Sequence, residues 1–178
     1  MKEETKKNFY LFLRYLFLVL IAVPGFDIFY YFLLPATLYP VYYILKISFA
    51  PVLLGHVIFL GQKSIEIVGA CVAGSAYYLL LILNLSVPKI KPLLRIKMIF
   101  FSFLVFLVIN IIRIIILSFM YVDNSSIFNI VHEAFWYIGS TVVVVGIWFL
   151  EVWIYKIKGV PFYTDLKRIY NESSLKRK

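Results

Sequence analysis

The chain has 178 residues and a net charge of +9; 63% of its residues are hydrophobic, only 15% are charged, and the mean hydropathy is +0.92. A soluble domain of this composition would expose too much apolar surface to water, so the composition excludes an ordinary soluble protein. Nearly uncharged runs of about 20 residues recur along the chain. They predict an all-α integral membrane protein, with residues 1–178 forming a single membrane domain.

The positive charge raises the question of nucleic acid as a partner. However, the Lys and Arg residues stand in short clusters between the apolar runs and towards both ends of the chain. This placement is typical of cytoplasmic segments that contact anionic lipid, so we expect membrane lipid and no nucleic acid as a partner. The single cysteine, Cys71, excludes an intrachain disulfide and a zinc site of several cysteines.

The first predicted span runs from about Phe9 to Leu34, with a kink at Pro24-Gly25. Its apolar part is too long for the core of a signal peptide and lacks a small-x-small cleavage site before the kink. We therefore expect a retained anchor rather than a cleaved signal.

Residues 35–69 are predicted to lie on the outer side of the membrane. The first part, Pro35–Leu54, is apolar but interrupted by prolines and a lysine. Hydropathy alone does not decide whether it inserts, and we expect a helical segment in the outer leaflet. The second part reads as two short strands, Val57–Leu60 and Ser64–Val68, around a turn that contains Gly61. Because lipid-facing irregular backbone is not tolerated, this β-hairpin is expected outside the hydrocarbon.

Three more spans are predicted, over Ala70–Val87, Met98–Val122 and Ala134–Ile157. A basic loop, Lys89–Lys97, follows the first of these, and a polar loop, Asp123–Glu133, follows the second. Residues 158–178 form a basic tail. With the first span included, the membrane domain is expected to cross the bilayer about four times.

The Lys and Arg count predicts the orientation. With four spans, fourteen of the eighteen basic residues fall on one side: at the N-terminus, in the Lys89–Lys97 loop and in the tail with Lys156. Only Lys46 and Lys63 fall on the other side. The basic side is expected in the cytoplasm, which gives a multi-pass plasma-membrane protein with both termini cytoplasmic. A fifth span at Pro35–Leu54 would divide the basic residues between the two sides.

Three reactive side chains are predicted to converge near the outer face: Cys71, His132 and Arg113. An arginine inside a span costs about 2.5–3.5 kcal/mol on insertion scales and persists mainly where it faces a polar interior. Asn110 precedes Arg113 by three residues, lies on the same helical face and is expected to orient the guanidinium. The structural alternative is an arginine bound to backbone carbonyls or to Asp27.

Taken singly, Cys71 is typical of a small buried hydrophobe and His132 of a hydrogen-bonded interfacial histidine. Together with Arg113 they predict a nucleophilic site. A thiol becomes a nucleophile when an imidazole takes its proton, and a guanidinium stabilises the negative charge of a tetrahedral intermediate. Gly74 and Ser75, one turn after the thiol, are expected to keep its helical face open. This chemistry needs no metal and no organic cofactor.

The order of these motifs resembles the exosortase/archaeosortase family of membrane-embedded cysteine transpeptidases. The similarity covers about Thr37 to Trp148. It rests on a Gly-turn hairpin leading into Val68-Gly-Ala-Cys71-Val-Ala-Gly74-Ser75, on Asn110-Ile-Ile-Arg113, and on His132 after a short outer loop. The resemblance departs from the bacterial Cys-Ser-Gly pattern, and many archaeal members have arginine where this chain has His132.

The resemblance implies that Cys71 is the nucleophile, Arg113 the charge-stabilising residue and His132 the base. It further implies substrate proteins with a C-terminal sorting signal, formed by a short motif, a transmembrane helix and a basic cluster. The signal would be cleaved on the outer face and the acyl group passed to an acceptor such as a lipid headgroup.

Two alternatives of different kinds stay open. One is a simple signal-removing hydrolase with water as the acceptor. The other is a non-enzymatic membrane assembly or export subunit, in which Arg113 pairs with Asp27 or with a carboxylate of a partner.

Overall fold

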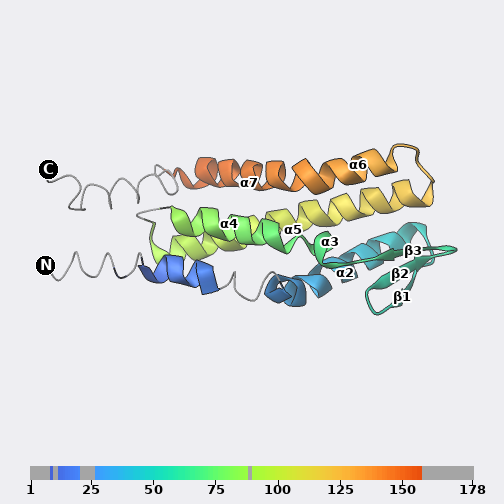
Figure 1. Cartoon of the computed structure of the whole chain (residues 1–178), viewed down its shortest axis with the longest axis horizontal. Coiled ribbons are helices and arrows are strands. Elements are labelled where there is room, and N and C mark those ends of the chain that lie inside the picture. Colours follow the sequence, from blue (N-terminus) through green and yellow to red (C-terminus); the bar gives the residue numbers. More distant parts are fainter. Residues whose placement is uncertain (1–8, 10–11, 21–26, 88–89, 158–178) are drawn as a thin grey trace, which may run out of the picture.

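The computed structural model describes residues 9, 12–20, 27–87 and 90–157. The described chain is mainly helical, elongated and accompanied by one small sheet (Figure 1). Residues 12–20 are helical. The further elements are α2 (Asp27–Ser48), β1 (Val52–Leu54), β2 (Val57–Leu60), β3 (Lys63–Glu66), α3 (Gly69–Val72), α4 (Gly74–Ser86), α5 (Pro92–Val122), α6 (Phe128–Ala134), the π-helix η1 (Phe135–Gly139) and α7 (Ser140–Tyr155).

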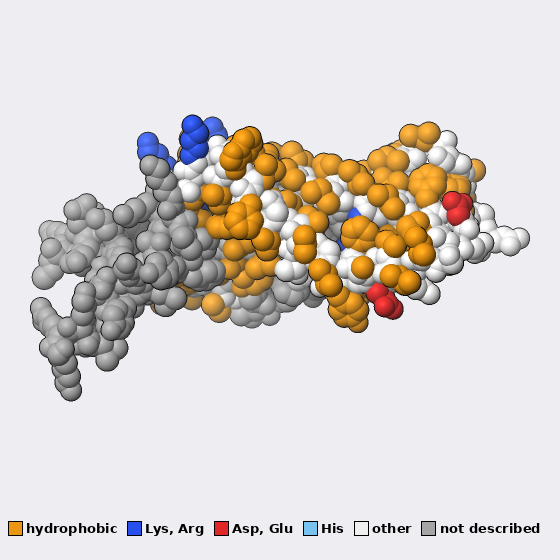
Figure 2. Space-filling view, turned by 90° about the horizontal axis from the view of Figure 1, so that it is seen from above, with side chains coloured by type: hydrophobic (Ala, Val, Ile, Leu, Met, Phe, Trp, Pro, Cys, Tyr) orange, Lys and Arg blue, Asp and Glu red, His pale blue; other side chains and the backbone are white. Residues whose placement is uncertain are grey.

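Among the described residues, three helical segments are long and apolar enough to cross a membrane: Gly69–Ser86, Pro92–Val122 and Phe128–Tyr155. Only 17% of the most apolar part of the last segment is buried inside the protein, so most of its apolar surface has no protein cover. Figure 2 shows a broad hydrophobic surface, with Lys and Arg side chains gathered near one end and Asp and Glu side chains towards the other. These features fit a multi-pass membrane protein.

The first predicted span differs from the structure at its C-terminal boundary. The kink predicted at Pro24-Gly25 lies outside the described residues. Beyond it, α2 begins at Asp27 and continues through Pro35 and Pro40 to Ser48, so the predicted change of segment at residue 35 is not a helix boundary. Each proline removes one backbone donor, which a helix packed among other helices tolerates.

The predicted hairpin is confirmed and forms part of a larger sheet. β2 and β3 pair antiparallel, and β1 adds a third strand in the order β1-β2-β3, where the sequence predicts only the end of a helical segment. Both turns have two residues and begin with a glycine at positive φ: Gly55 at +62° and Gly61 at +64°. This conformation is easy for glycine and closes a two-residue hairpin without strain.

The sheet packs against α2 and the C-terminal half of α5 at one end of the molecule (Figure 1). Ile58, Leu60 and Ile67 are buried in this core. Lys63 adds a polar contact, because its Nζ donates to Tyr121 O at 2.7 Å, Val122 O at 3.0 Å and Asn124 Oδ1 at 2.6 Å. The last carbonyls of a helix lack helical partners and carry partial negative charge, so a lysine is well placed there.

The polar loop predicted over Asp123–Glu133 is shorter in the structure. Residues 128–134 form α6, which continues through η1 into α7, and the connection after α5 is limited to residues 123–127. His132 is therefore helical and belongs to the same continuous helical segment as Ser140 and Glu151.

A buried polar cluster joins α4, α5 and α7. Asn84 Nδ2 lies 3.0 Å from Glu151 Oε2, 3.4 Å from Ser102 Oγ and 3.1 Å from the carbonyl oxygen of Leu80. Asn84, Ser102 and Glu151 are fully buried. Hydrogen bonds between apolar helices fix their relative rotation, because few other directional contacts are available to them.

Asn84→Leu is expected to lower the free energy of unfolding by about 1–3 kcal/mol, because it removes the amide that donates to the buried Glu151 carboxyl. The double variant Asn84→Leu/Glu151→Leu should recover most of this loss, since neither member of the pair is then buried without the other. Unfolding in mixed detergent micelles measures both. Equal stabilities for the double and the single variant would contradict this account.

Candidate functional site

Cys71 lies on α3, a single helical turn that is separated from α4 by one residue. This residue, Ala73, is in the left-handed conformation at φ 57° and ψ 48°, and it is buried. For a residue with a Cβ this conformation is about 1–2 kcal/mol less favourable than the right-handed one, so the surrounding packing must hold Ala73 there. The span predicted as one helix over Ala70–Val87 is thus interrupted two residues after the cysteine.

One pocket of about 220 Å³ brings together the three predicted catalytic side chains, Cys71, Arg113 and His132. They come from α3, α5 and α6, which are far apart in the sequence. The other walls are residues 64–67 on the sheet side, and Leu117, Tyr121 and Phe128 on the helical side. Because β3 supplies one of its walls, the pocket belongs to the end of the molecule where Figure 1 shows the sheet.

The thiol of Cys71 is partly exposed in this pocket. It points at the carbonyl oxygen of Glu66, with 3.8 Å between sulfur and oxygen. The sequence predicts that Asn110 orients Arg113; instead, Asn110 Nδ2 donates to the backbone carbonyl of Cys71 at 2.8 Å. This hydrogen bond from Asn110 holds α3, the turn that carries the thiol, against α5.

Arg113 is 9% exposed and has few partners for a buried cation. Its Nη1 donates to Ser140 Oγ at 3.4 Å, and its guanidinium carbon lies 5.9 Å from the centre of the Phe135 ring. Nε has no hydrogen-bond partner among the described residues. The alternative pairing with Asp27 falls on a side chain outside the described set. A guanidinium carries five donors, so this one has capacity left for an anionic group.

His132 is held between two aromatic side chains of its own helical segment. Its ring stacks on Phe128 at 5.5 Å between centroids, with 8° between planes, and meets Trp136 edge to face at 6.2 Å. These contacts fix the plane of the imidazole and leave its edge, where the nitrogens lie, for polar partners.

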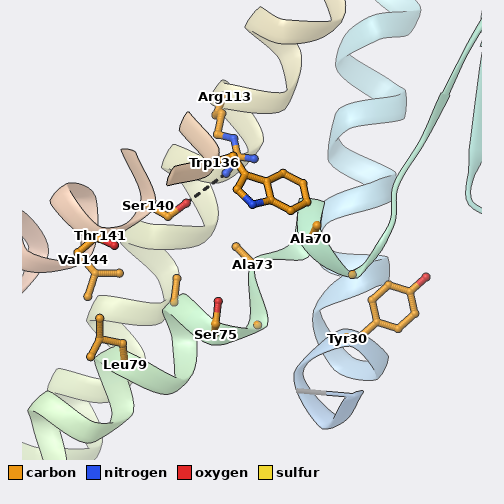
Figure 3. A pocket seen from close by; sticks show the side chains of 13 residues that line it. Tyr30, Ala70, Ala73, Ser75, Leu79, Arg113, Trp136, Ser140, Thr141 and Val144 are labelled. Atoms are coloured by element: carbon orange, nitrogen blue, oxygen red, sulfur yellow. Dashed lines mark hydrogen bonds between the residues drawn. The ribbon is translucent and has the colours of Figure 1, made fainter. Parts of the chain in front are cut away.

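Arg113 also borders a second, larger cavity of about 650 Å³. Gly74 and Ser75 line this cavity and not the pocket of the thiol, because the chain turns at Ala73. In Figure 3, Trp136 and Ser140 stand beside Arg113 at the upper wall, and Ser75 lies opposite them. Gly74 and Ser75, which the sequence predicts to keep the helical face of the thiol open, therefore line a different cavity from Cys71.

The sequence reasoning does not identify Trp136 and Ser140, although a signal for both exists. They follow His132 by four and eight residues, a spacing that would place all three on one side of a regular α-helix. Trp136 lies within the π-helix η1 and Ser140 directly follows it; the Ser140 hydroxyl donates to Phe135 O at 3.3 Å. Short π-helical turns often occur at functional sites, because they redirect side chains without ending the helix.

Gly139 lies in this π-helical turn, and a methyl group there has no room. A Cβ at this position would lie 2.9 Å from Cδ1 of Phe135, whose ring faces Arg113. At Gly146, two turns further on, a Cβ would meet nothing within 4 Å.

Gly139→Ala is therefore expected to lower the thermal unfolding midpoint in detergent. Gly146→Ala is the matched control; it should leave the midpoint unchanged or raise it, since alanine is favoured over glycine in a helix by about 0.5–1 kcal/mol. A Gly139→Ala protein at least as stable as Gly146→Ala would show that the close contact is not a constraint.

Chemically, the site combines a thiol, an imidazole and a buried cation with spare donors, which suits covalent catalysis at a carbonyl. Within the described ranges, no group of three or more His, Cys, Asp or Glu side chains is placed to hold a metal ion. The chain matches no protein-family model, no curated protein and no solved structure. Function has to be inferred from the side chains themselves.

Proposed function

We propose that the protein is a membrane-embedded cysteine transpeptidase that attacks a peptide carbonyl and transfers the acyl group to an acceptor. The observation that carries this proposal is the single pocket lined by Cys71, Arg113 and His132. In the described chain, Arg113 stands out as a nine-tenths buried cation whose donors are mostly unused.

In the first step, His132 takes the thiol proton and the sulfur of Cys71 attacks the peptide carbonyl carbon. The carbonyl π electrons move to oxygen, and Arg113 stabilises this oxyanion. Collapse of the intermediate breaks the C–N bond, His132 gives its proton to the leaving amine, and a thioester remains on Cys71. The thiol hydrogen-bonds to Glu66 O in the free protein, so it must rotate away from this oxygen to react.

In the second step, the acceptor attacks the thioester and releases the thiol. The larger cavity is where we place the acceptor, because Arg113 borders both cavities and Trp136, Ser140 and Thr141 give this one a mixed polar and apolar lining. An acceptor with a polar head and an apolar body, such as a lipid headgroup with its chains, suits such a lining.

The proposed topology has four spans, cytoplasmic termini and the thiol pocket on the outer face of the plasma membrane. This topology is supported by the Lys and Arg count and by which helix ends lie on the same side of the molecule. The helical residues 12–20, the start of α5 and the end of α7 lie at one end of the molecule, and the sheet lies at the other (Figure 1). From the resemblance to exosortases and archaeosortases, the substrates are exported proteins with a C-terminal motif, transmembrane helix and basic cluster.

Cys71→Ala is expected to abolish processing of such a substrate while the protein still inserts and folds, because no other thiol exists in the chain. Processing is followed by the mass of the substrate C-terminus in cells that express both proteins. Normal processing by Cys71→Ala would end the nucleophile assignment.

Arg113→Lys is expected to lower processing by at least about 100-fold, the usual loss when an oxyanion donor is removed. A lysine ammonium keeps the charge but lacks the planar set of donors. Arg95→Lys, in the first turn of α5, is the matched control and should retain processing. Loss of processing in both variants alike would point to a general effect of the substitution rather than to the site.

The product separates the proposed reaction from its rivals. A transpeptidase leaves a substrate C-terminus that carries the mass of an acceptor, whereas a hydrolase leaves a free carboxyl group. An assembly or export subunit would leave the substrate uncleaved, and its function would survive the loss of the thiol.

A further inference from the structure

β3 forms an edge of the sheet beside the thiol pocket. The strand order β1-β2-β3 leaves one side of β3 without a partner strand. Ser64, Ile65, Glu66 and Ile67 all line the pocket that holds Cys71. An unpaired strand edge offers a row of backbone donors and acceptors to another extended chain.

The register shows which backbone groups face this free edge. In an antiparallel pair, the backbone groups of successive residues point alternately towards the partner strand and away from it. Ile67 donates its N–H to His56 O at 2.9 Å, and Ile65 pairs with Ile58. The backbone groups of residues 63, 65 and 67 thus face β2, and those of Ser64 and Glu66 face away from it.

The position of the Cys71 thiol is a second, independent indication that the backbone groups of Glu66 face away from β2. The sulfur of Cys71 lies 3.8 Å from the carbonyl oxygen of Glu66, one of the groups that faces the free edge. Leu117, Tyr121 and Phe128 form the opposite wall. Lys63 joins the start of β3 to the end of α5 through Tyr121 O and Val122 O, which closes the gap at that end.

We propose that the acyl-donor peptide binds in this pocket as an added strand on β3. Its extended backbone pairs with the N–H and C=O groups of Ser64 and Glu66, and its scissile carbonyl lies beside Cys71. This inference rests on the proposed function and adds the mode of substrate recognition. Backbone pairing supplies affinity with little dependence on side chains, and pockets along the strand supply sequence preference.

The test uses the full-length protein in detergent and two probes that alkylate a thiol with loss of halide. Acetyl-Ala-Ala-Ala-chloromethyl ketone has an extended backbone, and its control is the same probe methylated on every amide nitrogen. Cys71 is the only cysteine, and the mass of the proteolytic peptide that contains it gives the rate at this residue, apart from any alkylation of His132. The plain probe is expected to react at least about fivefold faster than the methylated one, since one hydrogen bond contributes about 1 kcal/mol.

Ser64→Pro removes a free-edge donor without removing a donor to β2, and proline is tolerated at such positions. It should reduce the rate with the plain probe about fivefold and leave the rate with the methylated probe unchanged. Ser64→Ala, which keeps the N–H, should react like the natural protein. Equal rates for the two probes with the natural protein would overturn the proposal, and that comparison needs no variant to fold.

The same rates distinguish this inference from the proposed reaction. The ratio of the alkylation rate with the plain probe to the rate with the methylated probe reports on backbone pairing alone. The absolute rate with both probes reports on thiol activation, and it should fall in Arg113→Met and His132→Phe if these residues assist Cys71. If Arg113→Met and His132→Phe keep both the ratio and the absolute rates of the natural protein, the added strand is supported and the catalytic roles proposed for Arg113 and His132 are contradicted.

Discussion

The buried guanidinium of Arg113 is the constraint on which the rest of the site depends. A cation in an apolar helix bundle is unfavourable, and the described protein groups give it one hydrogen bond at 3.4 Å and one aromatic ring. Ser140, which accepts this hydrogen bond, is the residue directly after η1. The two cavities meet at this side chain, so its charge influences both. A protein without a task for this charge would be more stable with an apolar residue in its place.

The backbone around Cys71 shows how the thiol is held apart from the long helices. α3 has four residues, and its connection to α4 depends on Ala73 in a left-handed conformation. The carbonyl of Cys71 accepts from Asn110, and its sulfur faces Glu66 O. Three elements thus fix one short turn. This arrangement presents the thiol at the side of the sheet instead of burying it between helices, which is where a cysteine in an uninterrupted span would lie.

Hydrophobic patterning predicted the helical class, the apolar segments and the Gly61 hairpin, because each depends on local residues. It also predicted that Cys71, Arg113 and His132 lie near one another, since the order of segments fixes their depth. Other features depend on contacts distant in sequence. β1 forms only because Val52–Leu54 pairs with β2, and Ala73 adopts positive φ because its neighbours are packed around it. The continuity of α2 through Pro35 and the partnership of Asn84 with Glu151 likewise need neighbouring helices.

The π-helical turn has a consequence for the register of the last helical segment. A π-helical turn accommodates one residue more than an α-helical turn, and each residue of an α-helix advances the side-chain direction by about 100°. Removing a single residue from 135–139 would restore a regular helix, but it would rotate His132 and Glu151 relative to each other by that angle. One of them would then leave its present surroundings: the thiol pocket, or the contact with Asn84. Because of the extra residue, one continuous helix directs His132 into the thiol pocket and Glu151 towards Asn84.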